Sequence, residues 1–496
     1  MSVALKKLAS GGVVGIVSIL TSSLLRLVLL GVLSRLLSPE DYGIYVLGIS
    51  LLALLFSFST LGLPSAILRW GAIYSSQDKR KHLEILLAAS FSLTGLFSIA
   101  IALIIAKNPE YLQKYLVESL TENTLILVVA ILPLFVLVEV VSAAFRSKEN
   151  IVGYFGIKEL LPIVVQIILI FVLMLFYIDL FVAVSSLLIA YGVSLVAGIL
   201  FFIKKYHSIN VFLLKEFNIF RGDLKSITKF CVVIMLIGLL GVLKDRLPIF
   251  LLEGEVSNAL IGEFFNASRV AILMTIVLSG FNSILAPKVA ALYEAKDVDQ
   301  INLIYQSAVR WSIVVTMPVF VFLVLNSSWV MNTLFAMENE TAGMILLWLT
   351  LTRLVNLFAG SPGLIFQMAG IPKYDSWFLI LHVLMLALGL SLVIPLYGVL
   401  GGVLIILGVG LFVDLLRTYV VWSICKVIPI QLIPLISVLI GFSILFWFKS
   451  NIVEFSENNI MVLIVISLII AFTMSLSMIK RSDLILLKSL MLKNKV

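Results

Sequence analysis

Long apolar segments recur along the whole chain, and they constrain its fold more than any other feature of the sequence. A bilayer core of about 30 Å is crossed by a helix of roughly 20 apolar residues. Segments of about that length fall at 11–37, 42–68, 83–106, 123–145, 153–177, 181–203, 225–252, 263–287, 309–326, 342–368, 376–396, 399–423, 432–449 and 460–479. The sequence therefore predicts an all-α integral membrane protein with about 14 transmembrane helices.

The composition excludes several classes of soluble protein. Hydrophobic residues make up 61% of the chain and charged residues 12%, whereas soluble domains are about 45–50% apolar and about 25% charged. Cys231 and Cys425 lie far apart and the three histidines are scattered, so we expect no disulfide framework, metal site or bound cofactor. The net charge of +8 comes without a basic, aromatic-rich stripe, so we expect no nucleic-acid partner.

The charges between the predicted spans set the expected topology. With the N-terminus in the cytoplasm, almost all Lys and Arg outside the spans fall on the cytoplasmic side, as the positive-inside rule requires. The opposite side receives the acids Glu110, Glu118, Glu122, Glu253, Glu255, Glu338, Glu340, Glu454 and Glu457. We therefore expect a multi-pass protein of the cell membrane, with an even number of spans and both termini in the cytoplasm.

A long basic stretch divides the predicted spans into a group of six and a group of eight. Faint similarity between the two groups, including a proline at the end of the second and the eighth span, is typical of transporters built as a parallel repeat, which bind substrate between the halves. The predicted organisation is an N-lobe at 1–203, a cytoplasmic linker at 204–229, a C-lobe at 230–425, and two further spans with a basic tail at 426–496.

The segment Ser38–Gly43 predicts the start of a helix. Ser38 is a favourable N-cap, Pro39 suits the first helical position, and two acids follow in the first turn, where they interact well with the helix dipole. A capped helix is the simpler interpretation, and a gating or ion contact of Glu40 or Asp41 is the alternative.

Charged residues inside the predicted spans are candidates for function, because each costs about 2.5–3.5 kcal/mol at a helix centre. The candidates for a substrate-binding cavity are Arg26, Lys244, Arg246, Arg269 and Arg353. The acids in the spans are Glu139, Glu159, Asp245 and Asp414. Cations are in excess, which indicates a cavity that receives an anion. At about 1.5 Å per residue, Arg26, Arg246 and Arg269 reach similar depths, and arginine binds phosphate oxygens in bidentate fashion.

Two of the acids carry further expectations. Glu139 has no evident local partner, so it is a candidate for coupling transport to a proton or sodium gradient, with the membrane potential alone as the alternative driving force. Neighbouring positions on a helix lie about 100° apart. Asp245 therefore points away from its basic neighbours, and we expect it to pair with Arg26 or Arg269.

The remaining charges in the spans have simpler alternatives. Asp414 precedes Arg417 by three residues, so an ion pair along one helix face accounts for both. Lys158 and Glu159 either pair locally or face the lipid headgroups. Extension of the side chain to the membrane surface is the alternative for Arg35, Arg310 and Arg417. We expect His382 to be a hydrogen-bonded interior residue.

Three stretches carry a resemblance to a known family: SRLLSPEDYGIYVLGISLLALLFSFSTLGLPSAILR at Ser34–Arg69, GEFFNASRVAILMTIVLSGFNSILAPKVAALYEAKD at Gly262–Asp297, and GSPGLIFQMAGIPKYDSW at Gly360–Trp377. In these stretches the chain resembles polysaccharide biosynthesis proteins of the O-antigen flippase type. The resemblance implies two six-helix lobes arranged as a V, plus two extra helices. It also implies transport of a polyprenyl-diphosphate-linked oligosaccharide from the cytoplasmic to the outer leaflet.

The alternatives for function come from several classes. A lipid II-type flippase for cell-wall precursors also fits a cationic cavity, whereas a MATE-like drug exporter usually carries cations and favours an acidic one. A membrane glycosyltransferase, polymerase or ligase would need catalytic groups on large outer loops. The largest, 107–122, has no His or Arg, so we expect no catalytic residues. Expected partners are membrane lipids and either a glycan polymerase or glycosyltransferases; the glycan and the carrier, undecaprenol or dolichol, stay open.

Overall fold

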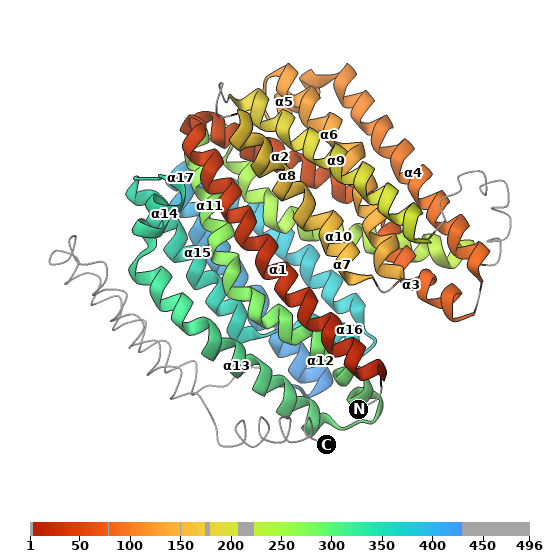
Figure 1. The fold of residues 1–496 in the computed structure, drawn as a ribbon. Coiled ribbons are helices and arrows are strands. Elements are labelled where there is room, and N and C mark those ends of the chain that lie inside the picture. Colours follow the sequence, from red (N-terminus) through yellow and green to blue (C-terminus); the bar gives the residue numbers. More distant parts are fainter. Residues whose placement is uncertain (1–2, 78, 149, 174–178, 207–222, 429–496) are drawn as a thin grey trace. The chain divides into compact units, whose positions relative to one another are not determined.

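The regular structure of the described residues is helical throughout (Figure 1). The computed structural model describes the chain except residues 1–2, 78, 149, 174–178, 207–222 and 429–496. Within these limits, the all-α membrane fold predicted from the sequence is confirmed. The predicted spans 432–449 and 460–479 and most of the predicted linker 204–229 lie outside the described residues. The number fourteen and the lobe boundaries therefore stay predictions.

The chain divides into two compact units, Met1–Phe265 and Asn266–Val496. The first unit contains α1 (Val3–Leu36), α2 (Pro39–Ser59), α3 (Leu63–Ser76), α4 (Arg80–Lys107), α5 (Pro109–Tyr115), α6 (Glu122–Ser147), α7 (Ile151–Phe155), the π-helical turn η1 (Gly156–Leu160), α8 (Leu161–Leu173), α9 (Leu180–Tyr206), α10 (Leu224–Leu252) and the start of α11 (Asn258–Ala271). The second unit contains the end of α11, the 3₁₀ turn η3 (Ile272–Thr275), α12 (Ile276–Glu294), α13 (Val298–Leu325), α14 (Ser327–Phe335), α15 (Glu340–Ala359), α16 (Pro362–Met368) and α17 (Pro372–Cys425).

In the described part of the chain, 11 helical segments are long and apolar enough to cross a membrane by length and composition. Most of their bounds lie close to the predicted spans, but α13 begins at Val298 rather than near 309, and the predicted span 342–368 contains two helices, α15 and α16. Two further differences bear on the fold. The first is α17, which has 54 residues and would be about 80 Å long if straight, far more than a bilayer core. It breaks at Gly398, whose φ of 59° and ψ of −152° are not helical. The break lies between the predicted spans 376–396 and 399–423, so α17 contains both.

The second difference concerns the predicted span 42–68, which is two helices. The Ser38 hydroxyl caps α2 as predicted, accepting a hydrogen bond from the Asp41 N–H at 3.1 Å. Helix α2 ends at Ser59, and α3 begins at Leu63. Between them Leu61 and Gly62 have φ values of 52° and 70°. The apolar composition continues through this turn, so the sequence pattern alone does not mark it.

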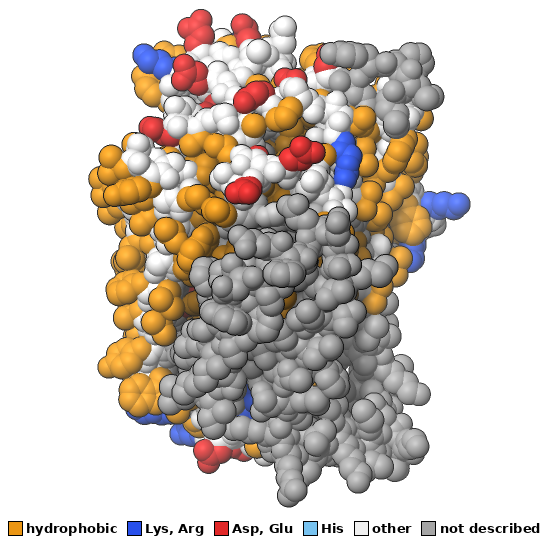
Figure 2. All heavy atoms as spheres, turned by 90° about the vertical axis from the view of Figure 1, so that its left-hand side faces the viewer, with side chains coloured by type: hydrophobic (Ala, Val, Ile, Leu, Met, Phe, Trp, Pro, Cys, Tyr) orange, Lys and Arg blue, Asp and Glu red, His pale blue; other side chains and the backbone are white. Residues whose placement is uncertain are grey.

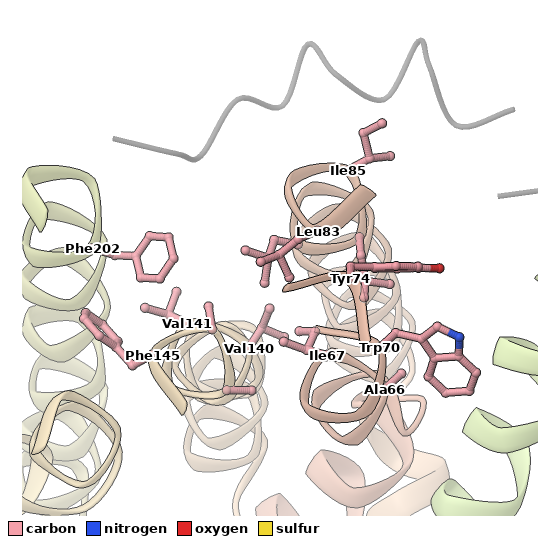
Figure 3. Close-up of a cluster of buried hydrophobic side chains, with 14 of the residues drawn as sticks. Ala66, Ile67, Trp70, Tyr74, Leu83, Ile85, Val140, Val141, Phe145 and Phe202 are labelled. Atoms are coloured by element: carbon pink, nitrogen blue, oxygen red, sulfur yellow. The ribbon is translucent and has the colours of Figure 1, made fainter. Parts of the chain in front are cut away.

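Helix α6 is the central helix of the first unit, packing against α2, α3, α4 and α9. One of its faces joins a buried hydrophobic cluster that also draws side chains from α3, α4 and α9 (Figure 3). Phe145 of α6 is fully buried there and lies with its ring 5.2 Å from that of Phe202, edge to face. This cluster anchors α3 and α9 to α6, which leaves α2 free to pack on α10 along another side.

Helices α2 and α10 run antiparallel along a seam of small residues. Ser50 with Arg246 and Ser57 with Gly238 are contacts between the two helices. Two more contacts flank them: Gly43 of α2 with Asn258 at the start of α11, and Gly62, just after α2, with Cys231 of α10. Small side chains allow two helix backbones to approach closely in a membrane. The antiparallel direction is what alternating topology requires of the second and the seventh span.

We expect Gly62→Ala to destabilise the seam. Alanine at a positive φ costs about 1–2 kcal/mol, and a Cβ at Gly62 would lie only 2.3 Å from the Cys231 carbonyl oxygen. Gly254→Ala is the matched control, because its φ is also positive, 79°, but nothing lies within 4 Å of the added Cβ. The melting temperature of the detergent-solubilised protein should fall more for Gly62→Ala than for the control. Equal decreases would contradict the close contact.

Large hydrophobic side chains are exposed on long helices, as expected of a surface in contact with lipid. Leu96, Leu388, Leu392 and Leu396 are exposed by 69%, 68%, 70% and 75%. A water-soluble protein rarely presents such side chains in extended patches. Figure 2 shows hydrophobic side chains over much of the described face and acidic side chains gathered toward one end of it. The chain is a multi-pass membrane protein.

Candidate functional site

Arg26 of α1 lies in the first unit with a carboxylate partner that is distant in sequence. Its Nη2 donates to Oε2 of Glu159 at 3.0 Å, across 133 residues of chain. The pair is only partly buried, since the Arg26 side chain is 47% exposed and that of Glu159 is 25% exposed. The sequence predicted a cavity cation at Arg26, but the pairing with Glu159 was not anticipated.

The π-helical turn η1 supplies a second ion pair next to the first. Lys158 Nζ lies 3.1 Å from Oε1 and 3.0 Å from Oε2 of Glu139 on α6, and 3.3 Å from the Tyr154 hydroxyl. Glu139 on α6 therefore has an ion-pair partner on η1, which the residues next to Glu139 in the sequence do not reveal. Consecutive residues of one turn thus reach two helices, and π-helical turns frequently mark functional positions. The coupling role predicted for Glu139 stays a prediction.

Arg246 of α10 is half-buried and has neutral partners among the described residues. Its Nη1 donates to the Ser50 hydroxyl of α2 at 3.4 Å, and its guanidinium lies 5.2 Å from the centre of the Phe265 ring. The neighbouring Asp245 is exposed. Within the described chain it forms no ion pair with Arg26, whose carboxylate partner is Glu159.

Arg246 interacts electrostatically with the neighbouring Asp245, as opposite charges, and to a smaller extent with Arg26, as two like charges. Two tyrosines, Tyr45 and Tyr191, also lie within electrostatic reach of Arg26. The Tyr45 hydroxyl accepts a hydrogen bond from the Gln166 amide at 3.3 Å. The first unit therefore brings two predicted cavity cations together beside polar side chains from α2, α8 and α9.

The other predicted cavity cations are Lys244, Arg269 and Arg353, and each is half-buried. Lys244 belongs to the first unit, whereas Arg269 and Arg353 belong to the second. Arg353, on α15, has no hydrogen-bond or ion-pair partner in the part of the chain that the structure describes.

The second unit contains a buried group of charges that the sequence revealed only in part. Arg417 forms a close ion pair with Asp375 near the start of α17 and lies 4.0 Å from Asp414, the expected i,i+3 partner. Asp414 also accepts a hydrogen bond from Asn356 of α15 at 3.0 Å. Asp375 was not a candidate, because it directly precedes the predicted span 376–396.

Of two arginines with an expected alternative at the membrane surface, Arg310 is buried and Arg417 is largely buried. The Arg417 side chain is 14% exposed, and Arg310 is 6% exposed and donates to the Ser307 hydroxyl at 3.0 Å. Polar partners inside the protein replace the headgroup region for both. Arg35 is exposed and donates to the Gly31 carbonyl of its own helix at 3.2 Å. His382 is buried, as predicted.

Outside the membrane-spanning segments, two titratable groups of the first unit have shifted pKa values. Burial raises the pKa of the Glu253 carboxyl, and hydrogen bonds from Ser119, including its N–H at 2.9 Å, oppose the rise. Burial also raises the pKa of Tyr74, and the hydrogen bond that its hydroxyl donates to Asp223 at 3.0 Å adds to the effect. These contacts connect α10 to the loop before α6 and to α3.

A metal centre has no support in the described residues, where no group of three or more His, Cys, Asp and Glu side chains could hold an ion. Cys231 and Cys425 are both free and buried.

A family model described as "Polysaccharide biosynthesis protein" matches residues 32–342. The match includes the first two of the three stretches that carry the resemblance found in the sequence. No curated protein matches the chain.

Solved structures of membrane transporters share the fold. "Lipid II flippase MurJ, inward closed conformation" has a TM-score of 0.74 at 13% identity, over 94% of this chain and 98% of that chain. An inward-facing multidrug resistance MATE transporter of the MOP superfamily has a TM-score of 0.66 at 15% identity, over 80% and 92%. A MOP superfamily transporter from Pyrococcus furiosus has a TM-score of 0.58 at 16% identity, over 83% and 94%. At these identities the likeness concerns the fold.

Proposed function

Because the chain belongs to the family of polysaccharide biosynthesis proteins, we propose that it moves a polyprenyl-diphosphate-linked oligosaccharide from the cytoplasmic to the outer leaflet by alternating access. The observation that carries the proposal is the presence in the first unit of two predicted cavity cations, Arg26, whose side chain is 47% exposed, and the half-buried Arg246. The two cations lie within electrostatic reach of each other, and Glu159 is the carboxylate that pairs with Arg26.

A diphosphate is the ligand class that matches this arrangement. Two like charges in a partly desolvated site repel each other, and an anion between them converts the repulsion into two attractions. The guanidinium group remains charged in a low dielectric and presents a planar fork of donors to phosphate oxygens. Arg246 already has its Ser50 and Phe265 contacts, which orient its side chain before a substrate arrives.

The proposed cavity includes further cations, and the transport cycle needs an energy source. Lys244, Arg269 and Arg353 are proposed as further cations for binding the diphosphate or an anionic glycan. A proton gradient, a sodium gradient or the membrane potential would drive the cycle, with Glu139 and Asp414 as coupling candidates. The protein would act in the cell membrane with both termini in the cytoplasm, beside a polymerase or glycosyltransferases.

A lipid II-type flippase is the second candidate, supported by the shared fold with a TM-score of 0.74. It uses the same diphosphate chemistry and differs in the glycan. A MATE-like exporter has the same fold, but a cationic drug would meet repulsion from Arg26 and Arg246. The arginines therefore favour an anionic lipid-linked substrate over a drug.

We expect Arg26→Ala and Arg246→Ala each to weaken engagement of the substrate about ten- to hundredfold, because a charge-assisted hydrogen bond contributes about 1.5–3 kcal/mol. Replacement by Lys should restore only part of the function, since the charge remains but the bidentate fork is lost. The measurement is surface glycan in a complementation assay, normalised to the amount of protein in the membrane.

Arg35→Ala is the matched control, since Arg35 lies on the same helix as Arg26, is exposed, and donates to the Gly31 carbonyl of its own helix. It should retain surface glycan near the wild-type amount. Wild-type glycan in both Arg26→Ala and Arg246→Ala would refute the proposed site.

A further inference from the structure

The two ion pairs around η1 differ in how easily their carboxylates can exchange for another anion. Arg26 and Glu159 are 47% and 25% exposed, whereas Lys158 and Glu139 are 25% and 13% exposed. Exposed ion pairs contribute little to stability, since water screens them. The ion pair of Glu159 with Arg26 therefore contributes little to the stability of the fold, and the fold does not require it to stay formed.

We propose that Glu159 is a displaceable counter-ion. It pairs with Arg26 in the substrate-free protein, the substrate diphosphate displaces it, and it pairs with Arg26 again when the substrate is released. This inference rests on the proposed function. A carboxylate carries one negative charge, whereas a diphosphate carries more and offers more acceptor oxygens, so it competes well for a guanidinium fork. Arg246 supplies the second attraction, because its direct partners are the Ser50 hydroxyl and the Phe265 ring and it forms no ion pair in the described chain, although Asp245 lies within electrostatic reach.

Lys158, the residue next to Glu159, attracts the Glu159 carboxylate after its displacement from Arg26. Glu159 lies within electrostatic reach of Lys158 and Tyr191. When the diphosphate takes Arg26, the Glu159 charge stays in the field of Lys158, which Glu139 already binds. Lys158 and Glu159 are consecutive residues of the π-helical turn, and their side chains reach α6 and α1 respectively. The same carboxylate then competes with the diphosphate and promotes its release.

The test measures binding of a glycan-free polyprenyl diphosphate to the purified full-length protein in lipid nanodiscs. We expect Glu159→Gln to lower Kd about three- to tenfold, the range of a partly exposed ion pair. Surface glycan should fall in cells because release slows. Glu159→Asp keeps the charge and should lie between the wild type and Glu159→Gln. Glu122→Gln, at an exposed glutamate in the first turn of α6, should leave Kd within twofold of the wild-type value.

The effect should depend on Arg26, because Glu159 acts through it. In an Arg26→Ala background, Glu159→Gln should no longer tighten binding. An unchanged or weaker affinity of Glu159→Gln, at wild-type melting temperature, would overturn the counter-ion role. If the wild type binds the probe and Arg26→Ala weakens it, that outcome leaves the proposed function standing. Absence of binding to the wild type would overturn both.

Discussion

Asp375→Asn should lower the free energy of unfolding by about 3–5 kcal/mol, the usual effect of removing one partner of a buried ion pair. The substitution preserves the shape of the side chain but leaves the Arg417 guanidinium, which is 14% exposed, with Asp414 at 4.0 Å as its remaining carboxylate. The Gln367 amide, which donates to Asp375 at 3.0 Å, would also lose a charged acceptor. The measurement is the melting temperature of the detergent-solubilised protein together with its abundance in the membrane.

The double variant Asp375→Asn with Arg417→Met separates a buried ion pair from a simple packing effect. Removing both charges of a buried pair costs far less than removing one, because no unpaired charge remains. The double variant should therefore melt at a higher temperature than Asp375→Asn alone. Lys373→Gln is the control, because Lys373 is exposed and near the same helix end. A double variant less stable than either single variant would show that the charges are not a pair.

The membrane spans could be predicted because the bilayer imposes one length on every helix that crosses it. The break between α2 and α3 was missed for the same reason. Leu61 and Gly62 turn the chain inside a continuous apolar run, through backbone angles that hydropathy does not record. The break at Gly398 was easier to predict, because Pro395 and a cluster of glycines surround it and mark a break in a long apolar stretch.

The charged residues of the interior could be predicted as individuals but not as pairs. Their presence in apolar segments marks them, because ionisable groups are rare there. Pairing depends on which helices are neighbours. Arg26 and Glu159 are 133 residues apart, and Arg417 and Asp375 are 42 apart. The i,i+3 spacing of Asp414 and Arg417 favoured the weaker contact, at 4.0 Å, and missed the closer partner.

A disulfide across the α2–α10 seam should reduce transport nearly to background. Ser57 of α2 and Gly238 of α10 are suited to cysteine substitution, since a Cβ built at Gly238 lies 3.4 Å from the Ser57 hydroxyl oxygen. That separation is compatible with a disulfide without backbone movement. In the proposed organisation α2 belongs to the N-lobe and α10 to the C-lobe. Rocking of the two lobes must therefore separate α2 from α10 during the cycle. A covalent link near the middle of the seam would hold one state.

The experiment compares oxidised and reduced Ser57→Cys/Gly238→Cys protein, with Cys231 and Cys425 replaced by alanine. Surface glycan should be lost on oxidation and return with a reductant, whereas either single cysteine variant should be unaffected by oxidation. Complete crosslinking with wild-type transport would mean that α2 and α10 move as one body. The moving boundary would then lie after α10, near the division at Phe265 and Asn266 where the chain separates into its two compact units. The outcome therefore decides whether α10 travels with the second half of the transporter or with the first.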